Sequence, residues 1–135
     1  MGVFQPGLLT DFDCEEVNEV TLNDANQTAT LAEVEVTARD GNTVWFTAHV
    51  TWVPSNNANN PFTLSIVREN NSIVCTALDS GTSAGRPITT AITCCDVVDE
   101  GTYTYRLVGQ RVNPTNIEIQ SGNFAAAVIN TDPMP

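Results

Sequence analysis

Apolar and polar residues alternate along much of the chain. In the clearest stretch, from Thr43 to Val53, every second residue is apolar, while Thr47, His49 and Thr51 lie between them. A repeat of two is typical of a β-strand with one buried face, because successive side chains of a strand point to opposite sides of its sheet. The apolar face of this predicted strand consists of Val44, Phe46, Ala48, Val50 and Trp52.

Strand-like runs of this kind recur between groups of turn-forming residues and predict about eight strands. Asp40-Gly41 and Asn70-Asn71, for example, each separate two runs at hairpin spacing. No segment shows the i, i+3, i+4, i+7 repeat of an amphipathic helix. The sequence therefore predicts an all-β fold, an antiparallel two-sheet β-sandwich, with the jelly roll as its natural eight-strand form. The predicted strands lie near residues 16–22, 30–39, 43–53, 61–69, 72–78, 87–98, 102–112 and 116–130.

The first 14 residues differ from the rest of the chain. Apolar residues crowd around Gln5-Pro6-Gly7, which interrupts any regular helix or strand. We therefore divide the chain into an N-terminal connector arm at residues 1–14, a jelly-roll domain at 15–131 and a short tail at 132–135. The arm is expected to dock on a neighbouring subunit through Val3, Phe4, Pro6, Leu8, Leu9 and Phe12.

Acidic residues dominate the charge of the chain. Its 135 residues include 16 Asp and Glu against 5 Lys and Arg, for a formal net charge of -11. Neither nucleic acid nor an anionic membrane surface is an expected partner, because both are bound through clustered Lys and Arg. No apolar run approaches the roughly 20 residues of a membrane span, and the first residues lack the basic and apolar regions of a signal peptide. We expect release without the usual secretory signal.

Four cysteines, Cys14, Cys75, Cys94 and Cys95, are candidates for disulfide bonds. None has the C-x-x-C spacing of a zinc or redox motif, so neither a metal nor another cofactor is expected. Cys94 and Cys95 are neighbours in a predicted strand and must face opposite sides of the sheet. Two alternatives remain open for each cysteine: a buried thiol or intrachain bridge, or a bridge between the arm of one subunit and a strand of another.

Residues 81–85 match the G-x-S-x-G pattern of a hydrolase nucleophile, but no helix follows the serine and the only histidine precedes it. His49, Asp79 and Ser83 follow the chain order of chymotrypsin without any similar serine loop. The protein is therefore not expected to be an enzyme, and His49 is interpreted as a surface residue.

Two acidic clusters, at residues 11–16 and 96–100, raise the question of calcium binding. Neither has the spacing of an EF-hand loop, with its central glycine and terminal glutamate. Solvated charge that keeps an assembly soluble and protects strand edges is the favoured interpretation.

The segment DEGTYTYRL at 99–107, followed by NIEI at 116–119 and NFAAAVI at 123–129, resembles the end of a known family of domains. These are small jelly rolls related to tumour necrosis factor and the complement globular head, found on bacterial spore-surface fibres and phage tail proteins. The resemblance covers about residues 30–130. Because such domains form trimers, it implies a trimer interface that includes Tyr103, Tyr105, Phe124 and Val128; the alternative is that these residues fill the subunit's own core.

The arm and the resemblance together predict a structural, self-assembling subunit of an extracellular bacterial filament like an endospore appendage. Its partners would be copies of itself, as trimers stacked into a filament, and an anchoring or tip protein. Its location would be the cell or spore surface, reached by lysis or particle assembly. The alternative is a phage or virion tail or decoration protein that acts as a trimeric binding module and recognises a glycan through loops 54–61 and 79–87. Those loops hold mainly Asn, Ser, Thr, Gly and Pro, which favours the filament.

Overall fold

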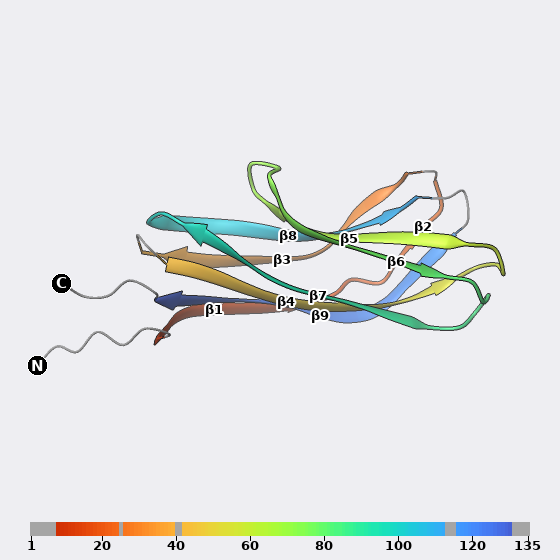
Figure 1. The fold of residues 1–135 in the computed structure, drawn as a ribbon, viewed down its shortest axis with the longest axis horizontal. Coiled ribbons are helices and arrows are strands. Elements are labelled where there is room, and N and C mark those ends of the chain that lie inside the picture. The colour runs from red at the N-terminus through yellow and green to blue at the C-terminus, as the bar shows by residue number, and fades with distance from the viewer. Residues whose placement is uncertain (1–7, 25, 40–41, 113–115, 131–135) are drawn as a thin grey trace, which may run out of the picture.

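The computed structural model describes residues 8–24, 26–39, 42–112 and 116–130, which form two β-sheets packed face to face (Figure 1). Within these residues there are nine strands and no helix, so the predicted all-β sandwich is confirmed. The strands are β1 (Leu8–Glu16), β2 (Val20–Leu22), β3 (Thr28–Ala38), β4 (Asn42–Pro54), β5 (Asn60–Arg68), β6 (Ile73–Gly81), β7 (Ile88–Val98), β8 (Gly101–Arg111) and β9 (Ile117–Asn130).

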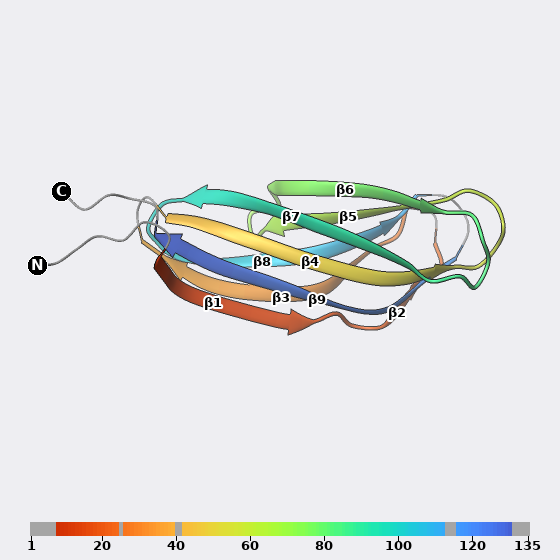
Figure 2. The same ribbon diagram turned by 60° about the horizontal axis from the view of Figure 1, so that its bottom comes forward.

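Strands that are distant in the sequence lie side by side, as in a jelly roll. Sheet A has the order β1-β9-β4-β7, and the short β2 pairs with β9 beyond the end of β1 (Figure 2). Sheet B has the order β3-β8-β5-β6. All these pairs are antiparallel. The predicted strands at 43–53 and 102–112 correspond to β4 and β8 with ends one residue away.

The N-terminal part departs from the prediction. Residues 8–16 form β1, which pairs with Asn123–Asn130 of β9, so the sheet begins inside the segment expected to be an arm. The single strand predicted at 16–22 is wrong, because residues 17–19 separate β1 from β2. Of the expected docking residues, Leu8, Leu9 and Phe12 are in β1, while Val3, Phe4 and Pro6 lie outside the described residues.

The core lies between the two sheets and is filled by the alternate side chains of their strands. Its largest fully buried members are aromatic, and they pack against one another across the sandwich: the ring centroids of Phe46 and Tyr105 are 4.5 Å apart in an edge-to-face arrangement, and those of Trp52 and Phe62 are 5.0 Å apart with tilted planes. Burying one such side chain contributes about 1.5–3 kcal/mol, so this layer supplies much of the driving force for folding.

Three of the residues assigned to a trimer interface belong to this core. Tyr105, Phe124 and Val128 have 0% relative exposure, so they offer no surface to a neighbouring subunit. Tyr103 is half-buried against the same core, and its hydroxyl donates to the carbonyl of Asp99 (2.9 Å). The interface expectation is corrected for the three buried residues, and the alternative that they fill the subunit's own core holds.

The sandwich is closed at one long side by a covalent bond. Cys75 of β6 and Cys94 of β7 form a disulfide that joins an edge strand of sheet B to an edge strand of sheet A. Cys95, the next residue, is exposed with a free thiol. The prediction that the neighbouring cysteines face opposite sides of their sheet is therefore confirmed.

A polar chain reinforces the same side. The indole N–H of Trp52 donates to Thr90 Oγ1 (2.9 Å), and the Thr90 hydroxyl donates to Asp79 Oδ2 (2.7 Å). These bonds link β4 and β7 of sheet A to β6 of sheet B. Because each buried donor has an acceptor, the aromatic core carries no unsatisfied polar group at this point.

Candidate functional site

The candidate site is the outer face of sheet A, meaning the side chains that point away from sheet B. The strand register arranges them in rows across β1, β9, β4 and β7. Three successive rows contain no charged residue, and we call these twelve residues the apolar patch. The rows are Leu9, Ile129, Thr43 and Val97; then Phe12, Ala127, Trp45 and Cys95; then Cys14, Ala125, Thr47 and Thr93.

The apolar patch exposes large side chains to solvent. Leu9, Phe12 and Trp45 are 53%, 54% and 52% exposed, and Val97 is 70% exposed. Single exposed apolar residues are common on proteins, but a group on adjacent rows marks an interaction surface. With four strands about 4.8 Å apart and rows about 7 Å apart, the patch measures roughly 20 Å in each direction.

A shallow depression of about 140 Å³ lies within the patch. It is walled by Phe12 and Trp45, and its floor is formed by the small residues of β9 between them. The full lining is Phe12, Trp45, Phe46, Thr47, Thr93, Ala125, Ala126 and Ala127. A depression with aromatic walls suits an apolar side chain, because water in it finds few hydrogen-bonding partners.

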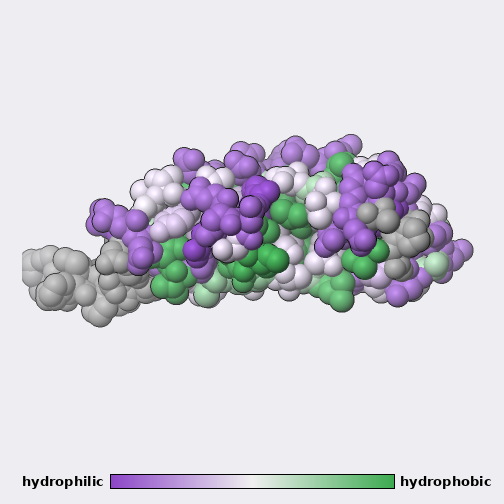
Figure 3. Space-filling view, turned by 90° about the horizontal axis from the view of Figure 1, so that it is seen from above, coloured by the Kyte–Doolittle hydropathy of each residue, from purple (hydrophilic) through white to green (hydrophobic). Residues whose placement is uncertain are grey.

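The side of the molecule formed by sheet B has a different character. Figure 3 shows that hydrophilic residues cover most of it, with hydrophobic ones in smaller groups toward one long margin. Glu33 and Glu35 of β3 are exposed there, and the exposed apolar residues Ile73 and Leu78 belong to the edge strand β6. The two faces of the sandwich are thus chemically distinct, and sheet A presents the surface suited to association.

Both free thiols lie at the margins of the apolar patch. Cys14 is on β1 and Cys95 is on β7, the outermost strands of sheet A, and both are exposed. Three strand spacings separate them, about 14 Å, whereas a disulfide needs Cα atoms within roughly 7 Å. The two cysteines therefore cannot bond to each other within one chain, and a bridge to another subunit stays a prediction.

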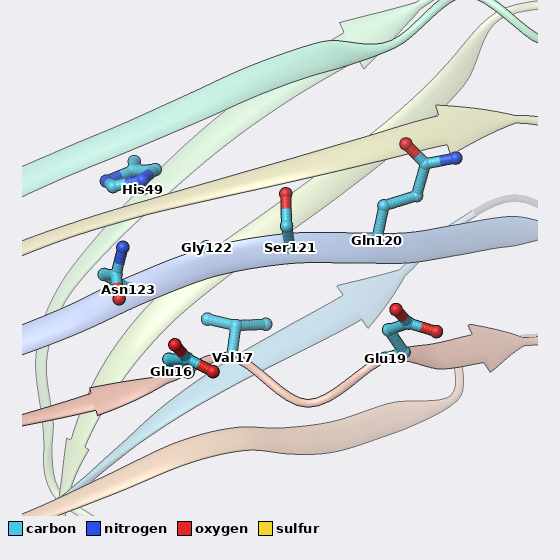
Figure 4. Close-up of a pocket in the computed structure, with 8 residues that line it drawn as sticks. All are labelled: Glu16, Val17, Glu19, His49, Gln120, Ser121, Gly122 and Asn123. Carbon is cyan, nitrogen blue, oxygen red and sulfur yellow. The ribbon is translucent and has the colours of Figure 1, made fainter.

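Beyond the third row the outer face becomes polar (Figure 4). A pocket of about 370 Å³ lies beside the break between β1 and β2 and is lined by Glu16, Val17, Glu19, His49, Gln120, Ser121, Gly122 and Asn123. A Cβ atom on Gly122 would lie 2.1 Å from the His49 carbonyl oxygen, so only glycine allows β9 to approach β4 this closely. His49 is exposed here, on the polar side that its place in the alternation predicts.

The residues considered for catalysis are not brought together. His49 points outward from sheet A, whereas Asp79 accepts the hydroxyl of Thr90, whose side chain points inward beside the core. Ser83 belongs to the loop between β6 and β7. In the part of the chain that the structure describes, no group of three or more His, Cys, Asp or Glu is arranged to hold a metal ion.

A charged cluster underlies the β7 margin of the apolar patch. Arg68 forms a salt bridge with Asp96 of β7, and the Tyr105 hydroxyl donates to Asp96 Oδ2 (3.0 Å). Burial raises the pKa of Tyr105 above its ordinary value, and the negative charge of Asp96 acts in the same direction. Asp96 is thus an ion-paired residue rather than the solvated charge expected, and it fixes the strand that carries Cys95 and Val97.

One position in the sequence indicates the apolar patch. Trp45 lies between Thr43 and Thr47, on the face of its strand that also carries His49 and Thr51, and breaks the alternation. A large apolar residue on the solvent side of an amphipathic strand costs solubility unless a partner covers it. Val97 carries no such signal, because its run, Cys94 to Val98, has no clear polar face.

No helix among the residues described is long and apolar enough to cross a membrane. Neither a protein-family model nor a curated protein matches the chain. Its fold, however, is similar to those of solved structures.

The structure of infectious bursal disease virus, Gx strain, is similar over 94% of this chain, with a TM-score of 0.60 and 11% identity. The chain spans 35% of that viral chain. The VP2 subviral particle of the same virus is similar over 91% of this chain and 38% of its own, with a TM-score of 0.52 and 7% identity. Eiger TNF from S. frugiperda is similar over 97% of this chain and 99% of its own, with a TM-score of 0.53 and 12% identity. The likeness shows a jelly-roll fold shared with Eiger TNF and with proteins of viral particles, and the tumour-necrosis-factor-like part is what the sequence resemblance implied.

Proposed function

We propose that this chain is a structural subunit that assembles with copies of itself into an extracellular filament of the endospore-appendage kind. The N-terminal segment of one copy docks on the apolar patch of the next. The observation that carries the proposal is the apolar patch itself, in which Leu9, Phe12, Trp45 and Val97 are more than half exposed. Hiding the exposed part of each from water contributes on the order of 1 kcal/mol to association.

Charge supports self-association at this particular surface. Each copy carries a formal net charge of -11, so two copies repel each other over most orientations. The twelve residues of the apolar patch include no charged side chain, so contact there avoids burying like charges against one another.

The reach of the N-terminal segment matches the size of the patch. Residues 2–7, if extended, span about 20 Å, which is the breadth of the patch. β1 begins at Leu8 next to the first row, so a neighbour whose β1 lies near this margin delivers its residues 2–7 across the face. Phe4 is the large apolar side chain of that segment, and the depression between Phe12 and Trp45 offers it aromatic contacts.

The disulfide supports an extracellular location. Bonds such as Cys75–Cys94 persist in oxidising surroundings and are rare in the reducing cytosol. Assembly of jelly-roll domains into larger particles has a precedent in the viral particles whose fold this chain shares.

Glutamate substitutions on the outer face test the proposal. Trp45→Glu and Val97→Glu place a charge in the apolar patch, whereas Ala91→Glu adds the same charge to the same face of β7, outside the patch. We expect filaments in negative-stain electron microscopy from the native chain and from Ala91→Glu, and none from the two patch variants. Circular dichroism establishes that all the variants keep the β fold.

Two results would contradict the proposal. Discrete monomers or trimers from the native chain, with and without reductant, exclude a self-assembling filament. Filaments that persist in both patch variants show that another surface makes the contact.

A binding module is the second candidate, favoured by the polar pocket of Figure 4. Its carboxylate, amide, hydroxyl and imidazole groups suit a ligand rich in hydroxyls, such as a glycan, as a phage or virion tail protein would recognise. Glycan-array binding by the native chain, lost in Gln120→Ala with Asn123→Ala and kept in Trp45→Glu, would favour this function over the filament.

A further inference from the structure

The strand β1 is attached to the domain without contributing to its core. Of its described side chains, Leu9 to Glu16, none is buried, and none appears among the core residues. It is nevertheless aligned with β9 over eight residue pairs, from Leu8 with Asn130 to Glu16 with Asn123. Backbone pairing and a few side-chain contacts therefore hold β1 in place.

The strand that receives β1 is also held by contacts that do not involve β1. Phe124, Ala126 and Val128 of β9 are fully buried between the sheets, and β4 pairs with β9 along its other side. At the far end of β9, β2 pairs with residues 117–119. Withdrawal of β1 would expose the backbone groups along this edge of β9, Asn123–Asn130, while β4 still pairs with the other side.

The contacts of β1 with the rest of the sandwich are the same whichever copy supplies them. Asp13 and Asp11 accept backbone N–H bonds from Glu35 and Thr37 of β3, and Phe12 lies beside Ala127 on the outer face. Exchange of an identical element between copies replaces each contact with its equal, so its cost is confined to the backbone that links β1 to the domain and to the entropy of association.

The chain is attached firmly to the rest of the domain directly after β1 ends. Val17 donates its N–H to the Gly122 carbonyl (2.9 Å), and Asn18 donates to the Leu31 carbonyl (2.9 Å). Val17 is also buried, at 8% exposure. The chain is thus anchored from Val17 onward, and a change of backbone direction at Glu16 would release β1 alone.

We infer that β1 is a donor strand: in the assembled state it pairs antiparallel with β9 of the next copy in the register that the single chain shows. This inference rests on the proposed function and identifies the partner, a second copy, and the acceptor, the β9 edge at residues 123–130. Where the copy that accepts a strand donates its own to a third copy, the contact does not close on itself and propagates as a filament. The donated strand also brings Leu9 and Phe12 into the apolar patch of the acceptor.

A disulfide between directly opposite residues of β1 and β9 shows whether β1 pairs with β9 of its own chain or with β9 of another copy. Cys14 lies opposite Ala125, and side chains of such pairs have Cβ atoms about 5 Å apart, within reach of a disulfide after a small adjustment. The test protein carries Ala125→Cys with Cys95→Ser, and is assembled before oxidation by oxidised glutathione. Two thiols each lose a hydrogen to form the bridge, and the glutathione disulfide is reduced to two molecules of glutathione.

Denaturing electrophoresis without reductant then reports which chains are joined. Donor-strand exchange predicts a ladder of covalent multimers that collapses to monomer on reduction. Monomers with an intrachain bridge, recovered from intact filaments, would overturn the exchange and leave the filament function standing. Bands that stop at the dimer would overturn open-ended exchange, and failure of the native chain to form filaments would overturn the proposed function together with this inference.

Two further variants keep the test decisive. Ala125→Cys with Cys14→Ser and Cys95→Ser lacks the β1 thiol and is expected to give no ladder. If the first variant does not fold, a second cysteine pair two residues along the strands replaces it. This variant carries Glu16→Cys and Asn123→Cys together with Cys14→Ser and Cys95→Ser. Residues 16 and 123 are direct partners, and both native side chains are exposed. The same ladder is expected from it.

Discussion

The Asp13 carboxylate accepts a hydrogen bond from the backbone N–H of Glu35 (Oδ2 to N, 2.9 Å), and Asp11 does the same for Thr37 (2.7 Å). β3 is an edge strand of sheet B, and these two N–H groups, two residues apart, lie on its unpaired side. Side chains of β1 thus accept the hydrogen bonds of the backbone N–H groups with which a strand of another molecule would pair. The acidic cluster expected to protect strand edges does so here through specific hydrogen bonds.

Removing both caps is expected to destabilise the domain and to expose the β3 edge. Asp11→Ala with Asp13→Ala loses two hydrogen bonds at about 0.5–1.5 kcal/mol each, which gives a loss of about 1–3 kcal/mol in the free energy of unfolding by urea. Asp11→Asn with Asp13→Asn keeps an acceptor oxygen at each position and should lose less. Equal losses in the two pairs would contradict a capping role.

The Cys75–Cys94 bond joins residues 19 positions apart in the sequence. A loop of that length restricts the unfolded chain by about 3 kcal/mol. Cys75→Ala with Cys94→Ala is therefore expected to lower the free energy of unfolding by about that amount, and a reductant should lower it similarly in the native chain. A reductant that destabilises the double variant equally would contradict this assignment, because the remaining thiols are not bonded within the chain.

Tyr105 gives the domain a dependence on alkaline pH. Its pKa is raised in the folded state, chiefly by burial, so the unfolded chain releases the phenolic proton more readily than the folded one. The stability linked to this group is fully present below the ordinary tyrosine pKa of about 10 and is lost as the pH rises through the folded value. Denaturant unfolding at pH 8 and at about pH 11 should show a larger fall for the native chain than for Tyr105→Phe. Equal falls would contradict the assignment to Tyr105.

Alternation predicted the strands that bury one face and expose the other. In β4, buried Phe46 and Trp52 contrast with exposed Thr47 and His49, and the prediction located that strand to within one residue at each end. β1 has no buried face, and its backbone hydrogen bonds to β9 do not require an alternation of apolar and polar side chains. The sequence therefore gave no indication that residues 8–14 belong to the sheet.

The candidate site was harder to predict because β9 is apolar on both faces. In its run from Phe124 to Val128 every residue is apolar, so the pattern does not say which residues face the core. The structure turns Phe124 and Val128 inward and leaves Ala125 and Ala127 on the outer face. Only the register with β1, β4 and β7 gathers those alanines with Trp45 into one patch, and register is a property of the folded sheet.

The contribution of the N-terminal segment can be separated from that of β1, because the strand begins at Leu8. A chain lacking residues 2–7 keeps every described contact of β1 and β9, so its free energy of unfolding should equal that of the full chain. If residues 2–7 dock on the apolar patch, this shortened chain should form no filaments in the electron microscope. Phe4→Ser, which removes the side chain matched to the depression at Trp45, should weaken assembly in the same direction.

The two modes of contact predict different outcomes for the shortened chain. Exchange of β1 needs only residues 8–16 and the β9 edge, whereas docking on the patch needs the residues before them. Filaments that form normally without residues 2–7 would exclude docking of that segment and leave exchange of β1 as the contact that propagates. Loss of filaments, with thermal unfolding unchanged, would show that the covered patch supplies binding energy that strand exchange alone lacks, since an exchanged strand only replaces contacts that the free subunit already makes.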